Sequence, residues 1–127
     1  MRRWIGRWIL GVGVVHNMVG IYFFLPTLRE IAAAGVWNSV DMDPMRNLAF
    51  WFLFSGFMIM LAGYVVDWIE NIADGVLPPA LGGSLLALLL MGIVTMPASG
   101  FWLLIPAIWG CFRAKRQDVG RLAHSGA

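Results

Sequence analysis

Charged residues are scarce in this chain of 127 residues. Asp, Glu, Lys and Arg make up 13% of it, whereas a water-soluble domain carries about 25%. So few charges cannot coat a soluble globule, which excludes an ordinary cytosolic enzyme, a disordered tail and a nucleic-acid-binding module. Hydrophobic residues make up 60% of the chain, and its mean hydropathy is +0.77. This composition predicts a membrane protein of one domain.

Cysteine and catalytic motifs are also nearly missing. The one cysteine, Cys111, lies in an apolar run, so no intrachain disulfide is expected and the thiol should be buried and inert. The sequence contains no P-loop, dinucleotide fingerprint, nucleophile elbow or zinc-protease motif. We predict no metal, because closed zinc sites need about four ligands. We also predict no cofactor, with a haem held by His16 of two chains in a dimer as the alternative.

Four apolar runs follow one another along the chain. The first is long enough to cross ~30 Å of hydrocarbon at 1.5 Å per residue. We therefore expect an all-α fold, an integral membrane antiparallel four-helix bundle, formed as a single domain by residues 1–117. The expected spans cover residues 4–25, 47–67, 80–96 and 100–113. We expect residues 118–127 to form a frayed basic tail, because they contain few apolar residues.

The segment between the first two spans contains two helix-capping patterns. Thr27-Leu28-Arg29-Glu30 has the form of a capping box, and Gly35 is a suitable helix stop. We therefore expect a short separate helix over residues 28–34, lying at the membrane interface. Asp43-Pro44 has the form of an N-cap followed by a first helical residue, so the second long helix should begin there and continue to about residue 73.

Seven of the nine Lys and Arg residues lie at the two ends of the chain, next to apolar runs. An even number of spans puts both ends on one side, and the positive-inside rule puts basic ends in the cytoplasm. The connection over residues 67–79 disagrees, since it has three acids and no Lys or Arg, but acids weigh little in this rule. Of these acids, Asp67 and Glu70 should form interfacial ion pairs with Arg2, Arg3 and Arg7.

Polar residues inside apolar spans are costly and are candidates for function. His16 and Asn17 are the clearest pair, and His16 shares a helix face with Gly13 and Gly20. Small residues mark close helix contacts in membranes, so His16 should point into the bundle. Residues at matching depth on the second helix, and residues of the two outer connections, complete one expected ligand pocket: Asn17, Trp37, Asn38, Asn47, Trp51, Ser55, Ser99 and Trp102. In the alternative interpretation, His16 and Asn17 only hydrogen-bond across helices.

Several segments together resemble a known group of proteins. They are Gly13-Val14-Val15-His16, the segment from Val36 to Val40, the segment from Phe50 to Phe54, and the segment from Met96 to Leu104. The chain resembles an uncharacterised family of small bacterial four-helix membrane proteins, which implies a multi-pass protein of the bacterial inner membrane. A looser likeness connects it to DoxX-like membrane proteins, some of which are implicated in quinone or thiol redox chemistry. The single cysteine argues against thiol chemistry within this chain.

Three hypotheses for function follow. In the first, the outer half of the bundle binds an apolar small molecule such as a lipid, an isoprenoid or a quinone, and His16 is the acid–base group. In the second, the chain is a structural or accessory subunit of a larger membrane complex, without its own catalysis. Expected protein partners are a second copy of the chain, in a homo-oligomer, or the other subunits of such a complex. In the third, it is a small transporter, which needs a wet pathway that opens to each side in turn. Membrane lipids are partners in all three, and nucleic acid in none.

Overall fold

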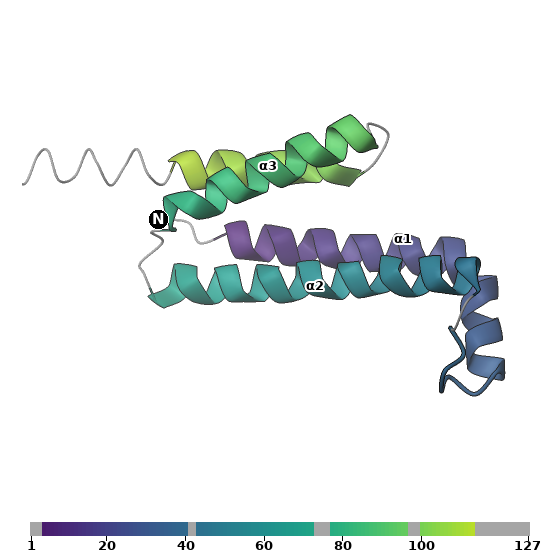
Figure 1. Ribbon diagram of the computed structural model, residues 1–127. Helices are drawn as coiled ribbons and strands as arrows, with labels where there is room; N and C mark the ends of the chain where they lie inside the picture. Colours follow the sequence, from purple (N-terminus) through teal and green to yellow (C-terminus); the bar gives the residue numbers. More distant parts are fainter. Residues whose placement is uncertain (1–3, 41–42, 73–76, 97–99, 114–127) are drawn as a thin grey trace, which may run out of the picture.

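The computed structural model describes residues 4–40, 43–72, 77–96 and 100–113, and within these ranges it is helical with no strand (Figure 1). Helix α1 comprises Ile5–Ala33, α2 Pro44–Ile72 and α3 Pro79–Thr95. A 3-10 helix, η1, comprises Gly100–Leu104 and continues as a regular helix to Arg113. The prediction of an all-α chain with four helices is confirmed, and the bounds of α3 and of the last helix lie within one residue of the expected spans.

Helix α1 is longer than the first expected span. It continues through Pro26 to Ala33, so the separate interfacial helix over residues 28–34 is wrong, and Thr27 lies inside a helix rather than at a cap. A proline removes one backbone hydrogen bond and bends a helix rather than always ending it. Strong helix formers such as Leu28, Arg29 and Ala32 then extend the helix. Figure 1 shows the last turns of α1 bent away from α2.

The end of α1 is a Schellman motif, as the position of Gly35 predicts. The Gly35 N–H donates to the Ala32 carbonyl at 3.2 Å, and the Val36 N–H donates to the Ile31 carbonyl at 3.2 Å. Gly35 has φ +91°, in the left-handed region that glycine adopts without a steric penalty. The connection that follows is tightly turned, because Val36 and Asn38 also have positive φ values, of 64° and 52°.

The beginning of α2 is capped by Asp43, and this prediction is confirmed. The Asp43 Oδ1 atom accepts hydrogen bonds from the backbone N–H groups of Met45, at 2.8 Å, and Arg46, at 3.0 Å. These bonds stabilise the ionised carboxylate, the Arg46 amide most strongly, and so lower the pKa of Asp43 below its ordinary value. Pro44 takes the first helical position, where no N–H is needed.

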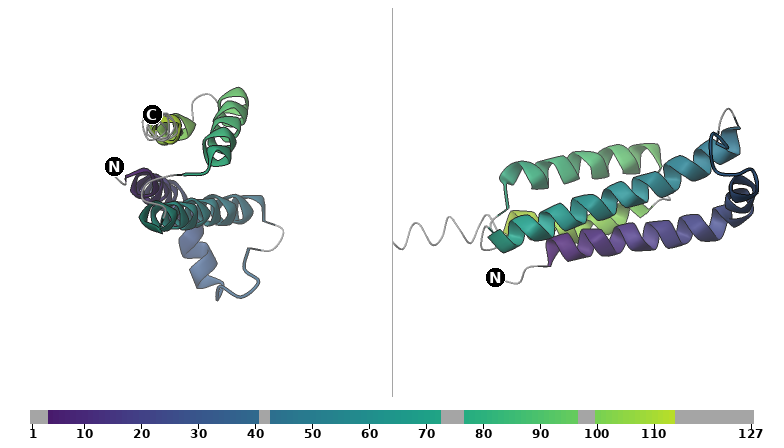
Figure 2. Two further views of the ribbon diagram at one scale, coloured as in Figure 1. Left: turned by 90° about the vertical axis from the view of Figure 1, so that its left-hand side faces the viewer. Right: turned by 90° about the horizontal axis from the view of Figure 1, so that it is seen from below.

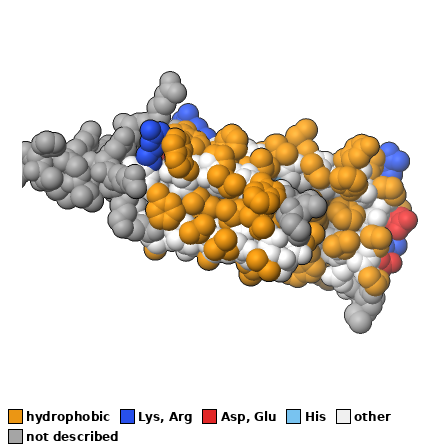
Figure 3. Space-filling model, turned by 90° about the horizontal axis from the view of Figure 1, so that it is seen from above, with side chains coloured by type: hydrophobic (Ala, Val, Ile, Leu, Met, Phe, Trp, Pro, Cys, Tyr) orange, Lys and Arg blue, Asp and Glu red, His pale blue; other side chains and the backbone are white. Residues whose placement is uncertain are grey.

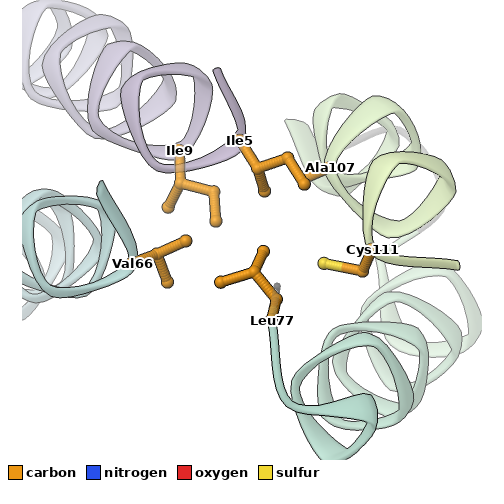
Figure 4. Packing of buried hydrophobic residues seen from close by; sticks show 6 residues of the cluster. All are labelled: Ile5, Ile9, Val66, Leu77, Ala107 and Cys111. Carbon is orange, nitrogen blue, oxygen red and sulfur yellow. The ribbon is translucent and has the colours of Figure 1, made fainter. Parts of the chain in front are cut away.

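The helices form two antiparallel hairpins. Helices α1 and α2 lie side by side, and α3 packs against the last helix; Figure 2 shows the two pairs from the end and from below. The hairpins meet near the start of α1, in a cluster of buried side chains that point toward one another (Figure 4). This cluster contains Ile5, Ile9, Val66, Leu77, Ala107 and Cys111. Cys111 is buried and free, as expected. The C-terminal part of α1 and the N-terminal part of α2 extend beyond α3 (Figure 1).

The contact between α1 and α2 depends on small residues spaced seven apart. Gly6, Gly13 and Gly20 of α1 are buried, and on α2 the small residues Ala49, Gly56 and Gly63 are buried at the same spacing. A Cβ added at Gly13 would lie 2.8 Å from the Met60 backbone nitrogen and 3.0 Å from the Gly56 carbonyl oxygen. The two backbones therefore approach too closely for larger side chains, which confirms the helix contact expected beside His16.

The surface is hydrophobic between two charged ends. Figure 3 shows charged side chains near both ends of one face, with hydrophobic side chains between them. On α2, the last charged residue of one end, Arg46, and the first of the other, Asp67, are 21 residues apart, about 31 Å at 1.5 Å per residue. Among the described helices, α1 and α2 are long and apolar enough to cross a membrane, since each contains an 18-residue stretch of high mean hydropathy, 1.7 in α1 and 2.0 in α2. The helices over Ala80–Thr95 and Gly100–Arg113 are apolar but shorter.

Candidate functional site

His16 contacts α2 through one edge of its ring. Its Nε2 atom lies 3.1 Å from the Phe52 carbonyl oxygen and 3.2 Å from the Ser55 hydroxyl oxygen. The Ser55 hydroxyl donates to the same Phe52 carbonyl at 2.7 Å. The structure thus brings together two residues of the expected pocket, His16 and Ser55, in one hydrogen-bonded group, which we call the His16 cluster.

The ring of Phe52 packs directly on this cluster. It stacks on the His16 imidazole with centroids 4.1 Å apart and planes 10° apart, and its centroid is 5.5 Å from that of Phe24. A Cβ added at Gly20 would lie 2.7 Å from the Phe52 ring. Gly20 therefore leaves the space in which Phe52 packs against α1, one turn above His16 and one turn below Phe24. Sequence reasoning did not select Phe52 because a phenylalanine in an apolar helix carries no distinguishing signal.

Asn17 is buried at the α1–α2 contact, with 8% of its surface exposed. Its amide nitrogen donates to the Met60 sulfur at 3.8 Å. Its Oδ1 atom has no hydrogen-bond partner in the described part of the chain and lies directly over Gly56. Asn17 thus lies between the helices rather than in an open site, and it fits there because residue 56 has no side chain.

An apolar groove opens between the C-terminal part of α1 and the N-terminal part of α2. It has a volume of about 430 Å³, and we call it the α1–α2 groove. Its lining comes from the second half of α1, up to its bend, and from the N-terminal half of α2: Val19, Phe23, Phe24, Pro26, Thr27, Met45 and Phe52. Val19 and Phe23 follow His16 by three and seven residues, so they share its helix face. Ser55 follows Phe52 by three residues on α2. The His16 cluster therefore borders the groove through Phe52, while His16 and Ser55 are not among its lining residues.

A second groove lies between α2 and the connection that follows α1. It has a volume of about 350 Å³ and is lined by Val36, Asn38, Ser39, Val40, Asn47, Phe50 and Trp51. We call it the loop groove. It brings together three residues of the expected pocket, namely Asn38, Asn47 and Trp51. The connection is held to α2 by Arg46, which donates to the Ser39 carbonyl at 2.9 Å and lies 3.9 Å from the Glu30 carboxylate.

The pocket expected as one site is thus divided in the structure. His16 and Ser55 contact Phe52, which lines the α1–α2 groove, whereas Asn38, Asn47 and Trp51 line the loop groove. The other expected members lie apart from both or outside the described residues. Trp37 is 92% exposed, Trp102 is in η1 and lines neither groove, Asn17 is buried between helices, and Ser99 is outside the described residues.

Asp67 and Glu70, which were expected to form ion pairs, lie near the start of α1 and the end of α2. The structure gives these two carboxylates different roles. Asp67 forms an ion pair with Arg7 at 3.3 Å, as predicted, whereas Arg2 and Arg3 lie outside the described residues. Glu70 is 2% exposed, and it accepts hydrogen bonds from the backbone N–H groups of Ile5, at 3.3 Å, and Gly6, at 3.0 Å. It thereby caps α1 from another helix. The apolar start of α1, which has no Ser, Thr, Asp or Asn at its N-cap, was the sequence signal for this role.

Trp8 connects the two hairpins. The Trp8 indole N–H donates to the Leu103 carbonyl at 2.8 Å. Leu103 belongs to η1, so this bond holds the last helix against α1 near the buried cluster.

Metal ligands do not gather in the part of the chain that the structure describes. No group of three or more His, Cys, Asp or Glu side chains there could hold a metal ion. The Met60 sulfur accepts a hydrogen bond from Asn17. The polar groups that the structure brings together beside the apolar groove are the His16 imidazole, the Ser55 hydroxyl and the Phe52 backbone carbonyl.

Comparisons with known proteins yield a family without an assigned activity. No curated protein and no solved structure matches the chain. A family model described as "Family of unknown function (DUF6463)" matches residues 1–118. Because this match covers nearly the whole sequence, the chain belongs to DUF6463, a family of unknown function.

Proposed function

We propose that this chain is a small integral protein of the bacterial inner membrane that binds an apolar small molecule in the α1–α2 groove. The lengths and hydropathies of α1 and α2 support membrane insertion, as does the apolar surface between two charged ends. The shorter hairpin of α3 and the last helix completes an antiparallel four-helix membrane bundle. The basic chain ends then lie in the cytoplasm, and the α1–α2 groove lies in the outer half of the bilayer.

The position of Phe52 is the observation that carries the binding proposal. One ring is shared by the apolar groove and the His16 cluster, since it lines the first and stacks on the second. Small-molecule sites combine apolar and aromatic walls with a few convergent polar groups, in volumes of about 300–1,000 Å³. The groove, at about 430 Å³, has this size and composition. A lipid, isoprenoid or quinone has the apolar body that such walls bind, and His16 supplies a hydrogen-bonding group.

The proposed binding function is tested by identifying small molecules that co-purify with the protein. The protein is purified in a mild detergent and analysed by native mass spectrometry, with extraction and identification of bound molecules. Phe23 lines the groove and is 70% exposed, so Phe23→Ala should reduce the bound ligand while the fold is kept. Phe57 is the matched control, because it is 57% exposed and lines neither groove, so Phe57→Ala should keep the ligand.

Two results would count against the proposal. If the parent protein carries no small molecule, the accessory-subunit hypothesis replaces it. If Phe23→Ala and Phe57→Ala lose ligand equally, the bound molecules are ordinary lipids that cover the whole apolar surface.

A further inference from the structure

The hydrogen bonds of His16 select one form of its ring. A carbonyl oxygen only accepts hydrogen bonds, so the Phe52 carbonyl, 3.1 Å from Nε2, requires a proton on that nitrogen. The Ser55 hydroxyl satisfies the same arrangement, because it donates its own proton to the Phe52 carbonyl and offers its oxygen to Nε2. In the neutral ring the second nitrogen, Nδ1, then carries a lone pair and accepts hydrogen bonds.

The Nδ1 atom faces away from α2. A Cβ added at Gly56 would lie 2.9 Å from His16 Cδ2, so the Cδ2–Nε2 edge of the ring is the one against α2. Nδ1 is on the opposite side of the ring. Within the described residues it has no hydrogen-bond partner, yet it is not among their fully buried unpaired atoms. It is therefore a partly accessible acceptor on the face of α1 that also carries Val19 and Phe23, and His16 itself does not line the groove.

The depth of His16 restricts what can reach this acceptor. His16 precedes Pro26, at the bend of α1, by ten residues, which is about 15 Å along the helix. This is about half of the ~30 Å hydrocarbon thickness, so Nδ1 lies near the middle of the bilayer. A phosphate or another charged headgroup is too costly to bring to this depth, whereas one neutral hydroxyl costs far less.

These observations narrow the ligand class, on the basis of the binding function proposed above. We infer that the α1–α2 groove binds a neutral, long-chain alcohol or phenol whose single hydroxyl donates its proton to His16 Nδ1. The apolar chain lies along Val19, Phe23 and Phe52. An ether, a ketone or a quinone of the same shape has no proton to give, so it leaves Nδ1 unpaired and binds more weakly.

Nitrogen-15 NMR shows directly which ring nitrogen of His16 carries the proton. The chain has two histidines, His16 and His124, so a histidine-labelled sample in lipid nanodiscs gives two sets of ring signals, and His124→Gln assigns them. We expect the His16 proton on Nε2 and an unprotonated Nδ1. Addition of 1-hexadecanol should shift the Nδ1 signal toward that of a hydrogen-bonded acceptor, whereas methyl hexadecyl ether should not. A proton on Nδ1 in the neutral ring would overturn the inference.

Binding of the same two probes separates this inference from the proposed function. Native mass spectrometry should show a roughly two- to tenfold preference for the alcohol over the ether, the value of one hydrogen bond. His16→Phe keeps an aromatic ring against Phe52 but removes the acceptor, so this preference should disappear while both probes still bind. If the parent binds both probes equally, the hydroxyl recognition is wrong and the groove remains a binding site. If it binds neither, both proposals fail.

Discussion

Gly63 provides the sharpest test of the helix contact on which the site depends. A Cβ at this position would overlap the backbone nitrogen of Leu10, and it would lie 2.8 Å from the Leu10 Cα and 2.9 Å from the Gly6 carbonyl oxygen. All three are backbone atoms of α1, so no side-chain rotation relieves the overlap. Gly63→Ala therefore forces α1 and α2 apart, which costs about 1–3 kcal/mol in a well-packed interior.

Gly11 is the matched control for this substitution. It also lies inside a helix, but a Cβ added there would have no atom within 4 Å. Both replacements gain the same helix propensity, up to about 1 kcal/mol, so the difference between the two variants isolates the overpacking cost. At about 4 °C per kcal/mol for a chain of this size, Gly63→Ala should melt roughly 4–12 °C below Gly11→Ala.

Circular dichroism melts of both variants in the same detergent measure this difference. Gly11→Ala should equal or exceed the parent in melting temperature. If Gly63→Ala melts as high as Gly11→Ala, the backbones are not in contact at Gly63, and the placement of Phe52 and His16 across the same interface loses its basis.

Three further predictions concern the ends of the helices. Glu70→Leu should lower stability by about 1–3 kcal/mol for each N–H group of α1 left unpaired, while Glu70→Gln, which keeps an acceptor, should cost less in the same melts. The lowered pKa of Asp43 means that its cap is fully present above pH 3.8 and is lost as the pH falls through the lower folded value; Asp43→Asn should remove this pH dependence of the melting temperature. A cysteine introduced as Trp37→Cys, at a 92% exposed position in a Cys111→Ala background, should react with an impermeant maleimide from outside intact cells. Reaction only after the membrane is opened would reverse the proposed orientation.

The sequence alone determined the helices and most of their ends. The apolar runs gave four helices because backbone groups in apolar segments must be paired within the segment. Local capping chemistry placed the Asp43 cap and the Gly35 stop, since both involve residues only a few positions apart. The same local reasoning failed at Thr27. Whether Pro26 ends α1 or only bends it is decided by the residues that follow and by what they contact, not by the capping pattern.

The tertiary structure decided which polar residues meet. His16 and Ser55 were expected at the same depth because they lie at similar distances from the ends of their helices, and the structure brings them together. The expected pocket as a whole is divided between two sides of α2. A helix face can be assigned from spacing, whereas the rotation of one helix against the next depends on the close packing of Gly13, Gly56 and their neighbours. The roles of Phe52 and Glu70 come only from that packing: Phe52 packs where Gly20 leaves room, and Glu70 lies opposite N–H groups that α1 itself leaves unpaired.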